Sequence, residues 1–481
     1  MNYSFLAKAE ECRPVLSATD RQVACGKLLR EGERGVLDFG THVTGYATIR
    51  LHAVGAPPDA PALLRVRFCE RAGEMDEDIS SYHGWIGKGW IQEEIIRLDV
   101  FPAVHVFQRR YAFRYICVDV LSLSQKYAVV LENATAHCVT SAPEQIPLCG
   151  GTEEERAIDA VALRTLSECM QYEFEDGPKR DRRLWLGDLR LQALANYETF
   201  GHNSLVKRCL YLFAGTADAD GRLSQCVFTV PSPVPDDASM YDYSLLFIPT
   251  LLDYYAATGD RETAEELLPL AKRQILLASE RFGNGVMRDS DRLGWCFLDW
   301  SLELNKQAGA QAVYIYAEKA LADLAEMLGE NVSAYRTDAE KKSSAALNAF
   351  YDQGSGLFVS GEGRQISYAT NVWCVLAGIL PKEENARLLG RLRERKDAVQ
   401  PVTPYMMHHY VQALADSGLM EEARETMRSY WGGMVRAGAD TFWELYDPED
   451  PEASPYGGKA VNSYCHAWSC TPAYFLRKYF H

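Results

Sequence analysis

The densest group of side chains that could catalyse a reaction lies in the segment 175–189, which reads EDGPKRDRRLWLGDL. Three aspartates, Asp176, Asp181 and Asp188, lie in it around three arginines, Arg180, Arg182 and Arg183. Carboxylates this close repel one another, which raises the pKa of at least one of them unless the arginines compensate. One carboxyl group could then stay protonated near neutral pH as a general acid while another stays ionised.

The same segment also has a purely structural interpretation. Gly177-Pro178 keeps its first half out of a helix, and Asp188 could cap a helix that begins at LRLQALANYETF. A solvated charged loop with a capping aspartate is what most such clusters turn out to be. However, Trp185 and Leu186 lie inside the cluster, and large apolar side chains in an exposed charged loop are unusual unless they line a pocket. The segment therefore predicts a pocket wall.

A second group of candidates lies near the other end of the chain, at 437–448 (AGADTFWELYDP) and 463–472 (SYCHAWSCTP). Glu444 follows Trp443 directly and lies between glycine and proline positions, so we expect it in a loop. His466 and Trp468 follow at a predicted helix start. A Trp-Glu pair alone means little, and a lone histidine is more often structural than catalytic.

Weaker candidates lie between these two groups. Asp242 could line a cavity or begin a helix, and the two interpretations have equal weight. Trp295, Asp299 and Trp300 belong to a hairpin-like stretch, GVMRDSDRLGWCFLDW, that could form a pocket wall. The sequence contains no Gly-rich phosphate loop, no Gly-x-Ser-x-Gly and no His-Glu-x-x-His, so nucleotide, serine-hydrolase and zinc-peptidase functions lack support. We expect neither a metal nor a cofactor.

Two domains must position these residues. Before residue 145, short runs rich in β-branched and aromatic residues alternate apolar and polar positions, as Val66 and Phe68 do with Arg65 and Arg67. Period-two alternation between turn signals predicts an antiparallel β-sandwich over 1–145. No cluster of exposed aromatic residues stands out from its strands, so we expect this domain to act as a scaffold.

From residue 146 to 481 the hydrophobic period is helical. We expect twelve helices in closely linked pairs, which suits a ring of six hairpins, an (α/α)6 barrel, with a cavity at the inner helix ends. A solenoid would also use helix pairs, but the sequence has no repeat of fixed period. The predicted helices are 152–171, 188–200, 203–215, 239–258, 260–281, 308–328, 334–351, 365–379, 382–396, 403–417, 420–435 and 461–478.

Composition limits the class of protein. The 481 residues carry a formal net charge of −16 with 47% hydrophobic residues, which is typical of a soluble globular protein and argues against nucleic acid as a partner. The chain shows no signal peptide and no apolar run long enough to span a membrane. Its thirteen cysteines are scattered and include no Cys-x-x-Cys pair, which is typical of free thiols in a reducing cytoplasm. Nothing in the sequence indicates an oligomeric state.

Several motifs together resemble the bacterial α-L-rhamnosidases of glycoside hydrolase family 78. They are Asp-x-Pro-x-Arg-Asp and Leu-Trp-x-Gly-Asp at 176–188, Tyr-Asp-Tyr-Ser-Leu-Leu at 241–246, Asp-Trp at 299–300, Thr-Phe-Trp-Glu at 441–444 and His-x-Trp-Ser at 466–469. More faintly, 37–45 and 113–115 are similar to the family's β-sandwich. The resemblance implies a six-hairpin catalytic barrel that hydrolyses terminal α-L-rhamnosides with inversion, the carbohydrate being the partner.

The resemblance also implies roles for individual residues. Asp176 and Asp188 match ligands of the sugar hydroxyls, Trp185 matches the aromatic residue that packs on the sugar, and Glu444 matches the general base. The general acid of most members is a Glu seven residues before the final Asp, a position that is Asp181 here. Because Asp is one methylene shorter, either the loop comes closer to the glycosidic oxygen or the acid lies elsewhere. The remaining candidates for substrate contact are Arg180, Asp242, Trp295, Asp299, Trp300, Trp443 and His466.

These roles agree with what inverting hydrolysis needs, which is an acid and a base about 6.5–9.5 Å apart with water between them. Two carboxylates from distant segments that meet across a barrel mouth could satisfy this, whereas neither segment could alone. Two alternatives stay open: another (α/α)6 carbohydrate-active enzyme such as a lyase or epimerase, and a carbohydrate-binding protein that has lost hydrolysis. An acidic chain is a poor match for the acidic polysaccharides that lyases cleave.

Overall fold

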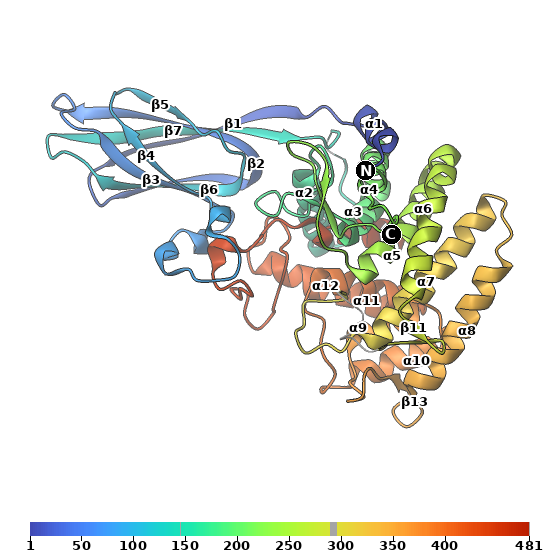
Figure 1. Ribbon diagram of the computed structural model, residues 1–481. Helices are drawn as coiled ribbons and strands as arrows, with labels where there is room; N and C mark the ends of the chain where they lie inside the picture. Colours follow the sequence, from blue (N-terminus) through green and yellow to red (C-terminus); the bar gives the residue numbers. More distant parts are fainter. Residues whose placement is uncertain (145, 289–295, 481) are drawn as a thin grey trace.

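The structure, a computed structural model, describes residues 1–144, 146–288 and 296–480. An elongated sheet domain extends from one side of a helical domain (Figure 1). The strands of the large sheet lie between Ser17 and Thr140, and helix α2 (Glu153–Cys169) opens the helical domain. Among the described residues, no helix has the length and apolar character needed to cross a membrane.

The sheet domain is an antiparallel sandwich whose two layers share one long strand, β2 (Arg34–Gly55). The first part of β2 pairs with β6, and its second part pairs with β7 and β5, with a register shift between Asp38 and Val43. The strand order is β1 (Ser17–Leu29), β7 (Tyr127–Thr140), β2, β6 (Tyr111–Ser122), β3 (Ala62–Cys69) and β4 (Glu93–Leu98), and β5 (Ala103–Val106) also pairs with β2. The alternation of Val66 and Phe68 with Arg65 and Arg67 works as expected, because both apolar side chains enter the core between the layers.

All twelve predicted helices are present. Besides α2 they are α3 (Leu186–Glu198), α4 (Asn203–Thr216), α5 (Tyr241–Thr258), α6 (Arg261–Ser279), α7 (Gln307–Met327), α8 (Ser333–Phe350), α9 (Tyr368–Leu376), α10 (Lys382–Arg393), α11 (Pro404–Asp416), α12 (Met420–Arg436) and α13 (Pro472–Lys478). Alternate helices contact one another: α3 contacts α5, α5 contacts α7, α7 contacts α9, α9 contacts α11, and α13 contacts α3. These helices form the inner ring of a six-hairpin barrel. The predicted fold class is therefore confirmed.

The last helix is much shorter than the predicted range 461–478. Two 3₁₀ turns, η5 (Lys459–Val461) and η6 (Ala467–Ser469), occupy its first part, and α13 begins only at Pro472. The backbone in between bonds to distant segments: Glu444 N donates to Ser463 O, His466 N to Phe442 O and Ala467 N to Asp176 O. These bonds join the two candidate segments and replace helical hydrogen bonds, which local periodicity cannot reveal.

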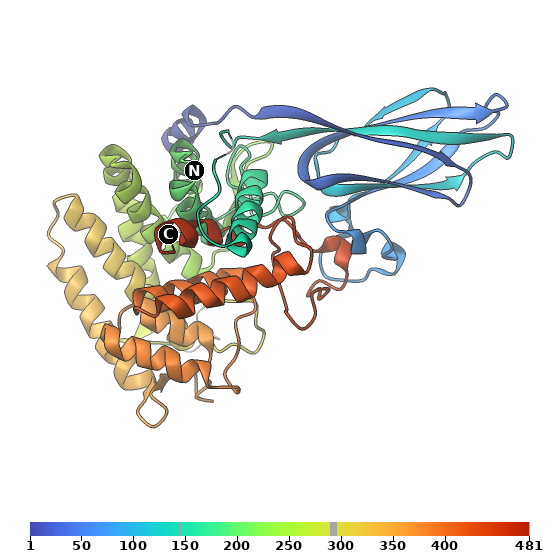
Figure 2. The same ribbon diagram turned by 180° about the vertical axis from the view of Figure 1, so that it is seen from behind.

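A helix at the N-terminus, α1 (Tyr3–Glu11), is not among the predicted elements. Although it precedes the sheet in sequence, it packs on α4 of the helical domain (Figure 2). The backbone N–H of Asn2 donates to Gly215 O at 2.7 Å, and a side-chain carbon at Gly215 would lie 2.5 Å from Leu6. The first residues therefore pack on the helical domain before the chain enters the sheet.

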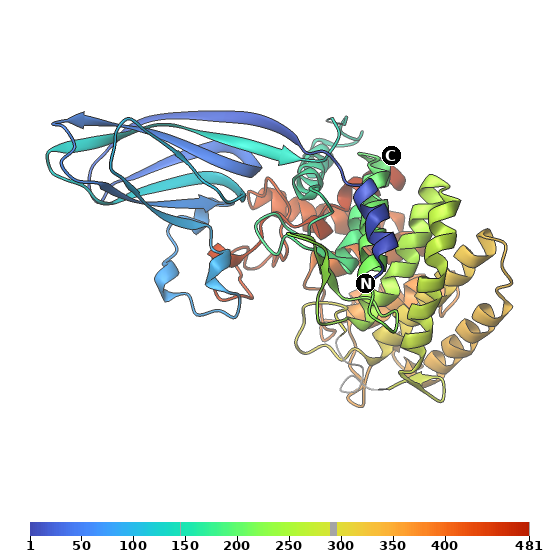
Figure 3. The same ribbon diagram turned by 45° about the horizontal axis from the view of Figure 1, so that its top comes forward.

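The connection between β3 and β4 is a long loop with three 3₁₀ turns, η1 (Ala72–Glu74), η2 (Ile79–Ser81) and η3 (Lys88–Trp90). It descends from the sheet and lies beside the C-terminal segment of the helical domain (Figure 3). Tyr82 donates its hydroxyl to Tyr456 O at 3.1 Å. A side-chain carbon at Gly84 would lie 1.8 Å from that same carbonyl oxygen, so this close approach requires glycine.

Candidate active site

One pocket collects most of the predicted residues. Its volume is about 680 Å³, and it lies where the barrel's loops meet the β3–β4 loop of the sheet domain. The predicted residues in its lining are Asp176, Arg180, Asp181, Trp185, Asp188, Trp300, Glu444 and His466. Segments more than 250 positions apart therefore meet in one cavity, as the two-carboxylate interpretation requires.

Asp176 shapes the loop that carries the other charged residues. Its two carboxylate oxygens accept the backbone N–H groups of Asp181 at 2.9 Å and Arg183 at 3.0 Å. Burial raises the pKa of Asp176 to about 7, and the neighbouring charge of Asp181 acts in the same direction. The side chain can therefore carry a proton near neutral pH while it holds the loop closed.

Three hydrogen bonds stabilise the charged form of Glu444. Arg180 donates to both of its oxygens, and the Tyr456 hydroxyl donates to Oε1. Burial acts to raise its pKa, but Arg180, the His466 charge and the Tyr456 hydroxyl outweigh burial and hold the pKa below its ordinary value. Glu444 is therefore ionised at neutral pH, as a general base must be.

Arg180 also faces the second catalytic candidate. Its Nη1 lies 3.9 Å from Asp181 Oδ1, while its Nη2 bonds Glu444. The Asp181 side chain is 20% exposed and is thus the more accessible of the two carboxylates. One guanidinium group therefore holds both carboxylates around the pocket.

Asp188 and His466 form a buried pair in the lining of the pocket, with His466 Nε2 3.2 Å from Asp188 Oδ1. Burial acts to lower the His466 pKa, but Asp188 and Glu444 outweigh it and the pKa is raised. Asp188 is not the helix cap that one interpretation expected, because Trp185 is the N-cap of α3 and Asp188 lies inside the first turn. Trp185 lines the pocket edge-on to the Tyr243 ring at 6.4 Å.

Three predicted substrate contacts lie behind the pocket wall rather than in its lining. Asp242 accepts the backbone N–H groups of residues 297 and 298 at 3.0 and 2.8 Å, and Asp299 accepts those of residues 402 and 403. The Trp443 ring is buried under the guanidinium of Arg71, 4.2 Å from its centroid. These side chains hold the loops that form the site. Trp295 lies outside the described residues.

Several lining residues are not among those predicted from the sequence. Trp85, Ile86 and Trp90 come from the β3–β4 loop, so the sheet domain is part of the pocket and is more than a scaffold. The stretch SYHGWIGKGW, with two tryptophans in a glycine-rich loop, was the available signal. Tyr456 follows a Pro-rich stretch, and nothing in its surroundings suggested contact with Glu444.

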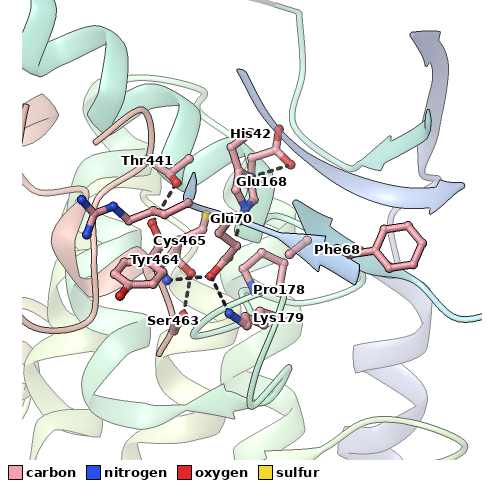
Figure 4. Close-up of polar contacts among 12 residues, drawn as sticks. His42, Phe68, Glu70, Glu168, Pro178, Lys179, Thr441, Ser463, Tyr464 and Cys465 are labelled. Atoms are coloured by element: carbon pink, nitrogen blue, oxygen red, sulfur yellow. Dashed lines mark hydrogen bonds and ion pairs between the residues drawn. The ribbon is translucent and has the colours of Figure 1, made fainter. Parts of the chain in front are cut away.

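A buried network of charges joins the two domains through Lys179, which lies between Asp176 and Asp181 in the chain (Figure 4). Lys179 Nζ bonds Glu74 at 2.6 Å and lies 3.5 Å from Glu70, both of which belong to the sheet domain. Glu70 also accepts the Tyr464 backbone N–H at 2.8 Å and lies 3.1 Å from His42 Nε2. Burial raises the pKa of Glu74 to about 7. The residue next to Arg180 is thus held by carboxylates of the other domain.

Comparison with known proteins identifies the family. The model of the glycosyl hydrolase family 78 alpha-rhamnosidase N-terminal domain matches residues 7–138, and that of the bacterial alpha-L-rhamnosidase 6 hairpin glycosidase domain matches residues 154–480. A rhamnosidase from Klebsiella oxytoca with rhamnose bound is 44% identical over 100% of this chain and 99% of its own, with a TM-score of 0.96. No curated protein matches the chain.

Two more distant structures share the fold. The family 78 rhamnosidase of Bacillus sp. GL1 is 24% identical with a TM-score of 0.79, over 94% of this chain and 47% of its own. The Streptomyces avermitilis α-L-rhamnosidase complexed with L-rhamnose is 16% identical with a TM-score of 0.71, over 97% and 44%. Fold, family models and the full-length similarity agree, and the chain belongs to the bacterial α-L-rhamnosidases of glycoside hydrolase family 78 and is a glycoside hydrolase.

Proposed function

We propose that this enzyme removes terminal α-L-rhamnosyl residues from glycosides or oligosaccharides with inversion of configuration. The observation that carries the proposal is that Asp181 and Glu444 line one pocket around a shared arginine, with Glu444 held ionised. An inverting glycosidase needs such a pair, separated widely enough to admit water. The K. oxytoca rhamnosidase with rhamnose bound supports the choice of sugar.

In the proposed mechanism, Glu444 takes a proton from water as the water oxygen attacks the anomeric carbon. Asp181 gives its proton to the glycosidic oxygen as the bond between that oxygen and the anomeric carbon breaks. Asp176, Asp188 and His466 would bind the sugar hydroxyls. Trp185 would offer an apolar face to the sugar's C–H groups.

Release of nitrophenol from 4-nitrophenyl α-L-rhamnoside tests the activity, with the α-L-arabinoside, α-L-mannoside and β-D-glucoside as controls. We expect turnover of the rhamnoside, and proton NMR should show the β-anomer as the first-formed sugar. Initial release of the α-anomer would contradict inversion. Binding of rhamnose without any turnover would instead support a protein that has lost hydrolysis.

We also propose that the enzyme works in the cytoplasm. All thirteen cysteines are free, and most are buried, which suits a reducing compartment. Fractionation of the native cells with an antibody against the chain tests this location, and recovery from an extracytoplasmic fraction would contradict it.

A further inference from the structure

Two cysteines that are 296 positions apart in the chain are in contact inside the helical domain. The sulfur of Cys169, the last residue of α2, lies 4.0 Å from the sulfur of Cys465, and both side chains are fully buried. Together with Ala467 they form a small buried cluster of their own. We call Cys169 and Cys465 the cysteine pair.

The cysteine pair lies directly behind the lining of the active-site pocket. Cys169 Sγ donates to Asp176 O at 3.8 Å, and the same carbonyl oxygen accepts the backbone N–H of Ala467 at 2.8 Å. Cys465 directly precedes His466 in the chain, and both Asp176 and His466 line the pocket. Hydrogen peroxide is hardly larger than water, so an oxidant of that size in the pocket is one residue away from the pair.

Cys465 has a cation among its neighbours (Figure 4). The buried imidazole of His42 lies 3.1 Å from Glu70 through Nε2 and 3.8 Å from Glu168 through Nδ1. Burial acts to lower the His42 pKa, but Cys465 and the two carboxylates outweigh burial and raise the pKa to about 10. His42 is therefore protonated at neutral pH, and cysteines react with oxidants most readily beside such a cation.

A disulfide between the two cysteines would change the site. The sulfurs of a disulfide are about 2 Å apart, so those of the pair must approach each other by about 2 Å. Movement that rotation of the two side chains does not supply must come from the backbone next to them, which leads to Asp176 and His466. That backbone has little free space, because a side-chain carbon at Gly177 would lie only 2.9 Å from Cys465 O. Since a close-packed interior transmits strain, the pocket lining should move with the pair.

From these observations we propose that the cysteine pair forms a disulfide on oxidation and that this bond inactivates the enzyme. The inference rests on the proposed rhamnosidase function, whose active form is then the reduced protein. It adds a means of regulation to the site, and the oxidant that it names is a peroxide.

The proposed reaction has two steps. The Cys465 sulfur takes one oxygen of hydrogen peroxide as the O–O bond breaks, which leaves a sulfenic acid and releases water. The Cys169 sulfur then attacks the sulfenic sulfur, and the hydroxyl group leaves with the Cys169 proton as a second water. Two thiols thus lose two electrons, and one peroxide is reduced to two waters.

The test oxidises the wild-type enzyme with hydrogen peroxide and measures the disulfide and the activity separately. Digestion with trypsin under non-reducing conditions should join the peptide 165–179 to the peptide 460–477, and mass spectrometry with fragmentation should place the bond at Cys465. We expect kcat on 4-nitrophenyl α-L-rhamnoside to fall about 10²-fold, the cost of about 1 Å of misplacement in an active site. Dithiothreitol should restore the activity.

Two variants locate the effect. Cys169→Ala removes one sulfur of the pair, so we expect this variant to keep its activity after oxidation. Cys470→Ala is the matched control, because Cys470 is also buried and belongs to the same tryptic peptide as Cys465 but lies outside the cluster. We expect the control to form the disulfide and to lose activity as the wild-type enzyme does.

Circular dichroism checks that the variants fold, and Cys169→Ser replaces Cys169→Ala if the alanine variant does not. Oxidised wild-type enzyme without the linked peptides, a disulfide that leaves kcat unchanged, or equal inactivation of the Cys169 variant would each overturn the proposal. Turnover by the reduced enzyme separates the two proposals, because its absence refutes the rhamnosidase function and the regulation with it, whereas turnover without any linked peptides refutes the regulation alone.

Discussion

At the scale of single residues, two aspartates compete for the role of general acid. Asp176 has the raised pKa that an acid needs, but both of its oxygens hold backbone N–H groups of the loop. Asp181, which the family resemblance proposes as the acid, lines the pocket and is 20% exposed, so a glycosidic oxygen could reach it. Geometry therefore favours Asp181, and leaving-group dependence distinguishes the two.

We predict that Asp181→Asn lowers kcat on a rhamnosyl disaccharide by about 10²–10⁴ and lowers it much less on 4-nitrophenyl α-L-rhamnoside. A sugar alcohol needs protonation to depart, whereas nitrophenolate leaves without it. Steady-state rates on the two substrates measure the difference, and Asp181→Glu should retain part of the disaccharide activity. Equal slowing on both substrates would make Asp181 a binding residue and move the acid to Asp176 or Asp188.

The hydroxyl of Tyr456 should set the acidic limit of activity. It donates to the Glu444 carboxylate and helps to hold its pKa below the ordinary value, so its removal by Tyr456→Phe raises that pKa. Glu444 then takes up a proton at higher pH, and the acidic limb of kcat/KM moves to higher pH. Tyr82→Phe removes a hydroxyl from the same cluster without touching Glu444 and serves as the control. A limb that stays in place in Tyr456→Phe would show that Arg180 and His466 alone fix the pKa.

At the scale of elements, the sequence predicts what is local. Each helix of the barrel has its own apolar face, so periodicity finds it, and Asp176, Asp181 and Asp188 are adjacent enough to be found as a motif. Trp85 and Tyr456 could not be found this way, because both lie in loops whose positions depend on the contact between domains. The polar roles of Asp242 and Asp299 depend on backbone N–H groups far along the chain, so their sequence context could not distinguish a loop support from a sugar contact.

The start of α3 depends on a glycine for its position. A side-chain carbon at Gly187 would lie 2.4 Å from the buried Tyr243 ring, so Gly187→Ala must displace either that ring or the first turn of α3, which carries Asp188. We expect a loss of about 1–3 kcal/mol in unfolding free energy and weaker binding of free rhamnose. Gly390→Ala is the matched control: it lies inside α10 with open space around it, and it should stabilise the enzyme by about 0.5–1 kcal/mol. Equal behaviour of the two variants would contradict the tight contact.

At the scale of the whole molecule, the sheet domain completes the active site in two ways. It supplies Trp85 to the pocket, and it supplies the carboxylates Glu70 and Glu74 that hold Lys179 beside Arg180. An apolar cluster that contains Tyr82 from one domain and Val461 from the other joins the two domains as well. These contacts join the loop 176–181, which we call the catalytic loop because it carries Asp181, to the neighbouring domain. The stability of the interface and the geometry of the pocket should therefore change together.

The strongest test of that interface is Lys179→Met, which leaves Glu70 and Glu74 buried without their shared cation. Since a buried charge without its partner is costly, we expect a loss of about 3–5 kcal/mol in the free energy of unfolding, measured by urea denaturation. In the wild-type protein burial raises the pKa of Glu74 to about 7 although Lys179 acts to lower it, so Lys179→Met raises this pKa further. Above about pH 7 the wild-type carboxyl ionises beside Lys179 while that of the variant keeps its proton, so the deficit of the variant grows as the pH rises. Lys272→Met, which removes a partly exposed partner of Glu330, is the control and should cost at most about 1 kcal/mol at any pH. If Lys179→Met costs no more than Lys272→Met, the network does not hold the two domains together, and the position of the catalytic loop is set within the barrel alone.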